Sequence, residues 1–184
     1  VSVNGDTKVE PNETFTVNLS NPSGATIADG TGLGTITNDD SASLSIDDVS
    51  HLEGDAGTTA FTFTVSLSAA SASPVSVTYQ TADGTATVAD GDYTAVPATV
   101  LTFSPGQTSK TVTVQVNGDL KVEPNETFTV NLSSPSGATI ADVTGVGTIT
   151  NDDSASLSID DVTQAEGNAG ATAFTFTVSL SAAS

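Results

Sequence analysis

Short runs of alternating apolar and polar residues recur along the chain, separated by Gly, Pro, Asn and Asp. In the clearest run, Phe61, Phe63, Val65 and Leu67 alternate with Thr and Ser. A period of two places successive side chains on opposite faces of a β-strand, so this run predicts a strand with one buried and one solvated face. Helix periodicity is absent. The pattern is that of an all-β protein.

Seven such runs fall between residues 42 and 150, and turn sequences such as Ser104-Pro105-Gly106 separate them. Seven short strands in a segment of this length predict an immunoglobulin-like antiparallel β-sandwich with the apolar positions in its core. The predicted strands are Ala42 to Ile46, Ala60 to Leu67, Val75 to Thr81, Thr99 to Phe103, Ser109 to Val116, Glu126 to Leu132 and Gly145 to Thr150.

The sequence also repeats itself with an offset of 113 residues: Glu10 and Glu13, for example, recur as Glu123 and Glu126. We therefore predict the C-terminal part of a repeat over 1–40, a complete repeat over 41–153 and the N-terminal part of another over 154–184. Only the complete repeat is long enough to bury a core. We expect the partial repeats to be a cut through a longer array. Alternatively, neighbouring chains supply their missing strands by strand exchange into a fibre.

The formal charge of −19 comes from 22 acids and three lysines. Such a charge excludes nucleic acid as the expected partner. Disorder is disfavoured because the apolar residues are regularly patterned. No Cys is present, so neither disulfides nor thiolate metal sites can form. No apolar run is long enough to span a bilayer, and no signal peptide is visible.

The acids of the complete repeat are segregated by connection. If successive strands run up and down, every second connection and the exit from the last strand lie at one end of the sandwich. Only Asp142 falls in a connection at the opposite end. The acids expected at the first end are Asp47, Asp48, Glu53, Asp55, Asp83, Asp90, Asp92, Asp119, Glu123, Glu126, Asp152 and Asp153.

Carboxylates crowded in this way repel one another, which raises the pKa of some of them unless a cation offsets the charge. Oxygen ligands from several loops, without Cys and with a single His, are typical of Ca²⁺, which takes six to eight oxygens in a flexible shell. Zn²⁺ is disfavoured, and Mg²⁺ demands tighter octahedral geometry. No EF-hand or Gly-Gly-x-Gly-x-Asp motif occurs. The alternative is an acid-rich, solubilising surface.

Four ordered motifs carry a family resemblance. They are Thr-Ala-Asp-Gly-Thr-Ala at 81–86 with Gly-Asp-Tyr at 91–93, Phe-Ser-Pro-Gly at 103–106, Glu-Pro-Asn-Glu-Thr-Phe at 123–128, and Thr-Ile-Thr-Asn-Asp-Asp at 148–153. Together they resemble a Calx-beta domain. That family includes the calcium-sensing domains of sodium/calcium exchangers and tandem arrays in bacterial surface proteins. The resemblance implies a sandwich that binds several Ca²⁺ ions at one end.

The same resemblance implies a set of ligands. Exchanger domains carry acids where this sequence has Gly118 and Asn151, so about one to three ions are expected here. Lys121 would contribute its backbone carbonyl. The implied metal-site residues of the complete repeat are Glu53, Asp92, Asp119, Lys121, Glu123, Glu126, Asp152 and Asp153, and those of the partial repeats are Asp6, Glu10, Glu13, Asp39, Asp40 and Glu166.

No catalytic arrangement is visible. His51, the only His, is expected in an exposed loop without a nucleophile to activate. We predict a calcium-binding structural repeat of a stalk, fibre or adhesin, at the surface of a bacterial cell or outside it. Calcium would stiffen the junctions, because one repeat runs into the next without a linker. The alternatives are a calcium-sensing regulatory module and a carbohydrate-binding domain.

Overall fold

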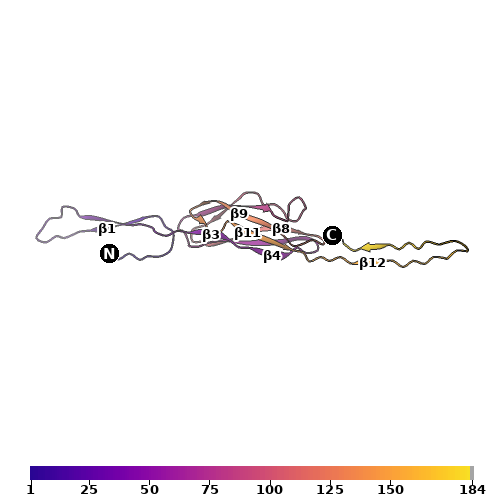
Figure 1. Cartoon of the computed structure of the whole chain (residues 1–184). Coiled ribbons are helices and arrows are strands. Elements are labelled where there is room, and N and C mark those ends of the chain that lie inside the picture. Colours follow the sequence, from indigo (N-terminus) through magenta and orange to yellow (C-terminus); the bar gives the residue numbers. More distant parts are fainter. Residues whose placement is uncertain (183–184) are drawn as a thin grey trace.

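The computed structural model describes residues 1–182, which contain strands and no helix. The molecule is elongated, with a central β-sandwich and a two-stranded hairpin projecting from each end (Figure 1). Among the described residues, no helix is long and apolar enough to cross a membrane. The strands are β1 Glu13–Asn18, β2 Thr31–Ile36, β3 Ser43–Ile46, β4 Val49–Leu52, β5 Gly57–Leu67, β6 Val75–Asp83, β7 Thr99–Phe103, β8 Ser109–Gly118, β9 Glu126–Ser136, β10 Thr139–Ile140, β11 Thr144–Thr150, β12 Leu157–Ile159 and β13 Val178–Leu180.

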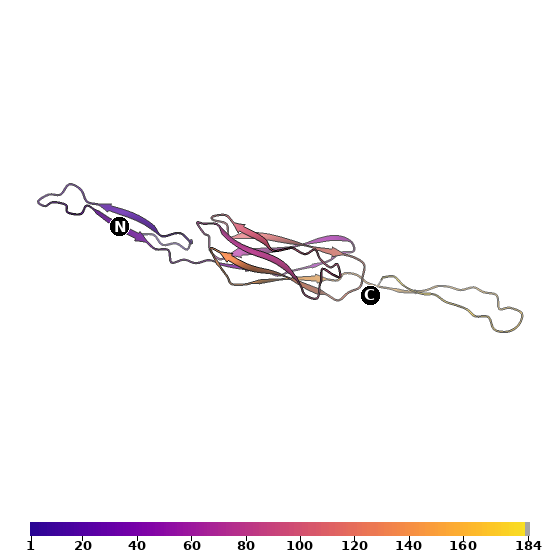
Figure 2. The same ribbon diagram turned by 90° about the horizontal axis from the view of Figure 1, so that it is seen from above.

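The sandwich consists of a four-stranded sheet in the order β10-β3-β5-β8 and a five-stranded sheet in the order β4-β11-β9-β6-β7. Seen from above, these strands run along the length of the molecule (Figure 2). The prediction of an all-β sandwich is confirmed, and all seven predicted runs form strands. The sandwich nevertheless contains two further strands, β4 and β10. Both pair in parallel, β4 with β11 and β10 with β3, so the sandwich is not purely antiparallel.

The extra strand β4 arises because the chain changes sheets between β3 and β4. Two acids satisfy backbone donors at this crossing: Thr64 N donates to Asp47 Oδ1 at 2.6 Å and Val146 N donates to Asp48 Oδ1 at 2.7 Å. The expectation that these acids join the acidic end is therefore wrong. His51 likewise lies on β4 rather than in a loop, with its ring edge-on to Phe61.

The core is built from the inward-facing residues of the two sheets. Phe61 and Phe63 of β5 face Phe128 of β9, with ring centroids 5.7 Å and 6.0 Å apart. All three rings are fully buried, as is Phe103 of β7. Aromatic side chains of this size each bury roughly 150–250 Å², so these rings dominate the apolar stabilisation of the sandwich.

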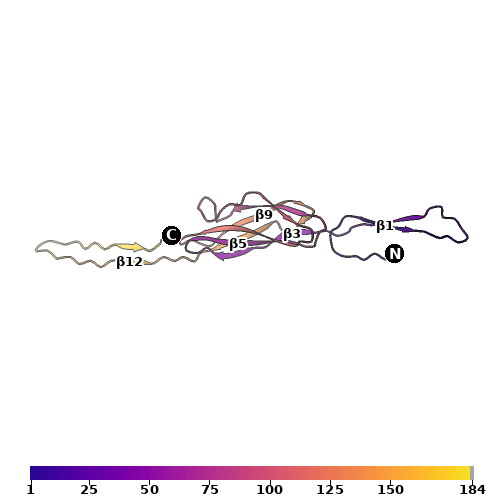
Figure 3. The same ribbon diagram turned by 180° about the vertical axis from the view of Figure 1, so that it is seen from behind.

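The terminal hairpins adopt the strand pairings of the sandwich without its second sheet. In β1 and β2, Glu13 pairs with Ile36, as Glu126 pairs with Ile149 in β9 and β11. Strands β12 and β13 repeat the pairing of β3 with β5, and their apolar side chains are exposed, Leu157 to 73%. Figure 3 shows both hairpins extending away from the sandwich.

Candidate metal centre

Three connections and the chain exit after β11 meet at one end of the sandwich. The connection after β4 lies directly over the end of β8, where a Cβ added to Gly118 would approach the carbonyl oxygen of Gly54 to 2.0 Å. Gly54 N donates to Asp152 Oδ1 at 3.1 Å, which ties this connection to the chain exit. These contacts fix the connection after β4 against the end of β8 and the chain exit.

The first acid group consists of Glu53, Asp152 and Asp153. One carboxylate oxygen of each lies within 4.8 Å of one from each of the others. Glu53 is only 6% exposed, and its backbone N donates to the carbonyl of Thr150 at 3.3 Å. Thr59 Oγ1 donates to the Glu53 carbonyl at 2.7 Å, so the backbone that carries this carboxylate is anchored on both sides.

The electrostatics of this group reflect burial and crowding. Burial, followed by the charges of Asp119 and Glu123, raises the pKa of Glu53 to about 7. Burial, followed by the charge of Asp152, raises the pKa of Asp153. Among the described residues, the buried Oδ2 of Asp153 has no hydrogen-bond partner. A buried carboxylate oxygen without a donor is costly, and a cation would satisfy it.

The second acid group consists of Asp92, Glu123 and Glu126, whose carboxylate oxygens also lie within 4.8 Å of one another. Burial raises the pKa of Glu126, and the charge of Asp92 and a hydrogen bond with it raise this pKa further. Asp92 Oδ2 accepts a hydrogen bond from Thr87 N at 2.6 Å, which fixes its orientation. Carboxylates held this close to one another repel, and a cation between them would offset that repulsion.

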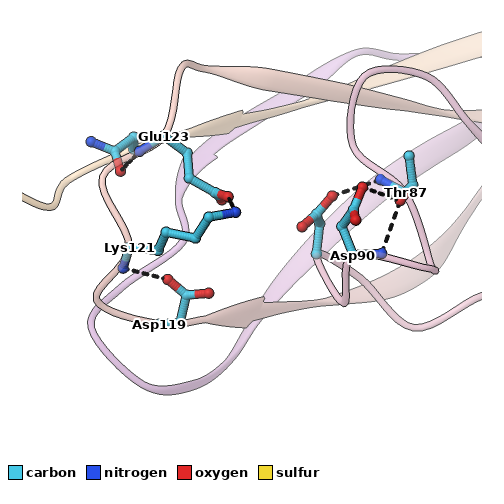
Figure 4. Close-up of polar contacts among 7 residues, drawn as sticks. Thr87, Asp90, Asp119, Lys121 and Glu123 are labelled. Carbon is cyan, nitrogen blue, oxygen red and sulfur yellow. Dashed lines mark hydrogen bonds and ion pairs between the residues drawn. The ribbon is translucent and has the colours of Figure 1, made fainter. Parts of the chain in front are cut away.

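Tyr93 anchors the long connection that carries Asp92. Its ring stacks on Phe128 at a centroid distance of 4.7 Å, and its hydroxyl donates to Asp83 Oδ1 at 2.6 Å. Burial and then the bond to Asp83 raise the pKa of Tyr93 to about 12. The sequence-predicted acids Asp83 and Asp90 support this loop internally, since Asp90 Oδ2 accepts from Thr87 Oγ1 at 2.9 Å (Figure 4).

The connection between β8 and β9 faces this loop across the acidic end (Figure 4). Lys121 N donates to Asp119 Oδ1 at 2.7 Å, and the Lys121 ammonium forms an ion pair with Glu123. The ammonium is therefore the fixed cation nearest to the second acid group. Asp119 belongs to neither group of three, although its charge acts on Glu53.

Sequence reasoning missed the function of Asn151. Its side chain accepts from Glu123 N at 3.2 Å through Oδ1 and donates through Nδ2 to the carbonyl of Asp153 at 3.0 Å. An acid could not donate the second bond, which gives a physical reason for an amide here. A signal existed, because Asn38 makes the corresponding bonds to Glu10 and Asp40 in the first repeat.

The sequence-predicted acids of the partial repeats are placed differently. A hollow of about 380 Å³ opens beside β1 and β2, where the complete repeat would place two further loops. Glu166 is exposed and belongs to neither acid group, and its carbonyl accepts from Thr172 Oγ1 at 2.6 Å. The acids that line the hollow are Asp6, Glu10, Glu13, Asp39 and Asp40.

The donor set of the complete repeat consists of carboxylate oxygens from four segments, and no Cys exists in the chain. Such donors suit a hard cation such as Ca²⁺. The Calx-beta domain model matches residues 1–49 and 37–163, which is most of the sequence. The chain belongs to the Calx-beta family. Calx-beta domains are non-catalytic, calcium-binding modules.

Solved structures agree with this Calx-beta assignment. The apo form of the Calx CBD1 domain has 24% sequence identity and a TM-score of 0.55 over 62% of this chain and 100% of that domain. CBD12 from CALX1.2 has 26% identity and a TM-score of 0.54, over 60% of this chain and 44% of that one. The calcium binding domain CBD12 of CALX1.1 has 24% identity and a TM-score of 0.54, over 64% and 50%. A comparison with curated protein sequences found no match.

Proposed function

We propose that the complete repeat binds Ca²⁺ through its two acid groups. The observation that carries the proposal is their convergence: six carboxylates from four segments meet at one end, and the buried Oδ2 of Asp153 has no donor within residues 1–182. Glu53, Asp152 and Asp153 would hold one ion, and Asp92, Glu123 and Glu126 another. Ca²⁺ would screen the repulsion that raises the pKa values of Glu53 and Glu126.

The donor geometry favours Ca²⁺ over Mg²⁺. The donors come from separate loops and spread over distances of up to 4.8 Å, which a cation with six to eight flexible ligands tolerates. Mg²⁺ requires near-ideal octahedral geometry at shorter distances and retains several waters. We infer that Mg²⁺ binds more weakly here. A competition titration that places the two affinities equal would remove this preference.

The role that we propose is structural: the chain would be part of an extracellular or bacterial cell-surface stalk, fibre or adhesin. Support comes from the elongated shape (Figure 1) and from the acid groups, which include Asp152 and Asp153 where the chain leaves β11 for the next repeat. Ca²⁺ at that position would stiffen the junction between neighbouring repeats. Like chains could complete the exposed hairpins by strand exchange. Sedimentation of the 184-residue chain tests that last point, because a monomer at high concentration excludes the exchange.

Thermal unfolding in Ca²⁺ and in chelator tests the binding itself. A ligand at one hundred times its Kd stabilises the native state by about 2.7 kcal/mol per site, so Ca²⁺ should raise the midpoint by several degrees. Glu126→Ala should lose much of this shift. Asp142→Ala is the matched control at the opposite end of the sandwich and should retain it. An identical midpoint in Ca²⁺ and chelator would contradict calcium binding.

The second candidate is a calcium-sensing module of a larger membrane or signalling protein. The structural similarity to exchanger-type CBD domains favours it. The two roles differ in the affinity that they need, because a cytosolic sensor responds at micromolar Ca²⁺, whereas an extracellular structural site needs only millimolar affinity. A Kd measured by calorimetry therefore separates them.

A further inference from the structure

The segment Lys8–Glu10 of the first partial repeat is bonded to the complete repeat. Val9 N donates to the carbonyl of Ala70 at 3.0 Å, and Ala72 N donates to the carbonyl of Val9 at 2.8 Å. Val9 and Ser71 thus form a parallel β-bridge between two repeats. The contact lies at the end of the sandwich opposite the acid groups, where the N-terminal segment reaches the body of the molecule (Figures 1 and 2).

The two faces of this segment have different partners. Lys8 and Glu10 form an ion pair at 2.5 Å and line the acidic hollow of their own repeat. Val9, between them, points the other way and packs on the core of the complete repeat. The backbone donors also alternate: Val9 N bonds to the complete repeat, whereas Glu10 N donates to Asn38 Oδ1 of its own repeat at 3.1 Å. This alternation is that of an extended strand.

The loop that receives Val9 is made of small residues. It connects β5 to β6 and reads Ser-Ala-Ala-Ser-Ala-Ser-Pro over 68–74. Ser71 is 4% exposed, and its carbonyl accepts a hydrogen bond from Gly106 N at 2.9 Å, so a second loop supports it. Small side chains allow the backbone of another repeat to approach within hydrogen-bond distance. We call residues 68–74 the receiving loop.

The complete repeat presents the same segment at its other end. Bonds within its own repeat position Lys121–Glu123 in the same way as Lys8–Glu10. Glu123 N donates to Asn151 Oδ1 as Glu10 N donates to Asn38 Oδ1, and Lys121 N donates to Asp119 Oδ1 as Lys8 N donates to Asp6 Oδ1. Among the described residues, Val122 makes none of the bonds that Val9 makes. The residue that the 113-residue offset places opposite Val122 is Ser184, which lies outside the described residues.

We propose that the outer edge of Lys121–Glu123 is the docking site for the receiving loop of a following repeat. Val122 would pair with the backbone of that loop in parallel, as Val9 pairs with Ser71. Recognition would be by backbone hydrogen bonds and by the smallness of the loop residues, so the partner is another repeat with a Ser/Ala-rich loop. This deepens the proposed function by naming the joint, but it rests on contacts that need no metal.

Spin labels across the observed joint test whether this bridge holds two repeats together. The chain has no Cys, so Thr16→Cys and Thr111→Cys, both at exposed positions, place one label on the hairpin and one on the sandwich. Val9→Pro removes the donor to Ala70, and Ala72→Pro removes the donor to Val9. In chelator, each variant should broaden the interlabel distance distribution about twofold, because the hairpin becomes free to reorient. Unchanged widths in both variants would overturn the proposal.

Val122→Pro is the matched control, since the same substitution falls in the same Lys-Val-Glu-Pro-Asn-Glu sequence. It should leave the distribution across the first joint unchanged. If it broadens that distribution as Val9→Pro does, the effect comes from loop damage rather than from the bridge, and the proposal fails. Broadening by Val9→Pro but not by Ala72→Pro would also overturn it, because both substitutions break the same bridge.

The docking site itself is tested by extending the full chain in register. A second copy of residues 72–184 placed after Ser184 completes the following repeat, because Ser184 corresponds to Ser71. With labels on Thr111 and on its counterpart in the added repeat, the distance distribution should be narrow, and Val122→Pro should now broaden it about twofold. A distribution that Val122→Pro leaves unchanged would refute docking at this edge. All measurements are made in chelator, so failure of the calcium proposal would leave this result interpretable.

Discussion

The N-terminal hairpin and its counterpart inside the sandwich have nearly the same sequence but different surroundings. The strand pairings are identical, residue for residue, from Glu13 opposite Ile36 to Asn18 opposite Thr31. Burial is not: Val17 is 44% exposed, whereas Val130, its counterpart, is fully buried. Strand pairing and loop hydrogen bonds therefore follow from local sequence. The core and the complete acid groups require the second sheet.

The acidic loops show the same contrast. Lys8 pairs with Glu10 as Lys121 pairs with Glu123. Only in the complete repeat do the connections that carry Glu53 and Asp92 close over these acids. The hairpin thus contains half of a metal site with the same local hydrogen bonds. The same substitution made in the hairpin and in the sandwich therefore separates local from long-range contributions to stability and to metal binding.

The largest difference is expected for the aromatic residue at the centre of each copy. Phe128→Ala should lower the free energy of unfolding of the sandwich by about 3–5 kcal/mol, because it removes a ring packed against Phe61, Phe63 and Tyr93. Phe15→Ala, at the corresponding position, should cost less than about 1 kcal/mol in the same urea-unfolding measurement. Equal losses would mean that the hairpin and sandwich unfold as one unit.

The next largest difference concerns calcium. Glu126→Gln should abolish the stabilisation that the ion of the second acid group supplies, about 2.7 kcal/mol at a hundredfold excess over Kd, because that group loses a charged ligand. Glu13→Gln makes the same change in the half-site, which lacks counterparts of Glu53 and Asp92. Calorimetric titration of both variants should therefore show loss of binding only for Glu126→Gln. Equal loss in the two would show that the half-site binds on its own.

Much of this architecture could be predicted from the sequence. The alternation of apolar and polar residues, as in Phe61 to Leu67, locates the seven predicted strands of the sandwich. Assigning each acid to one end of the sandwich by its connection places Glu53 with Asp152 and Asp153. Strand β4 could not be predicted, since its pairing with β11 depends on a change of sheet fixed by distant backbone donors. The bridging function of Asn151 was not predicted either: the recurrence of Asn at 38 and 151 marks the position, but the bonds that the amide makes leave no periodic pattern.

A smaller difference in stability is expected for substitution of Gly118 and of its counterpart Gly5. Gly118→Ala should destabilise the sandwich by about 1–3 kcal/mol, because the new Cβ would meet the Gly54 carbonyl at 2.0 Å and displace the loop that carries Glu53. Gly5→Ala is the matched control: Gly5 is the counterpart of Gly118, and no atom lies within 4 Å of its added Cβ. Thermal unfolding in chelator measures both. A neutral Gly118→Ala would show that this loop is free to move away.

The last difference concerns pH dependence and is confined to the metal-free sandwich. The pKa of Glu53 is about 7 in the folded chain against 4.5 for the free side chain. Below pH 4.5 both states hold the proton; between 4.5 and about 7 only the folded state does, so the stability of the metal-free sandwich falls as pH rises through this window. Glu53→Gln keeps a neutral side chain and should flatten this part of the pH profile. Glu166→Gln, at the exposed counterpart, should leave it unchanged.

The same titration makes calcium binding release protons. With a pKa raised to about 7, the Glu53 carboxyl is partly protonated in the metal-free chain at neutral pH, so binding of Ca²⁺ should release protons at this site. Calorimetry in two buffers of different ionisation enthalpy measures the number released. It should fall towards zero near pH 9, where the carboxylate is already ionised. Release that persists unchanged at pH 9, or that Glu166→Gln removes, would show that the proton comes from a group other than Glu53. That result would contradict binding of the ion by the first acid group.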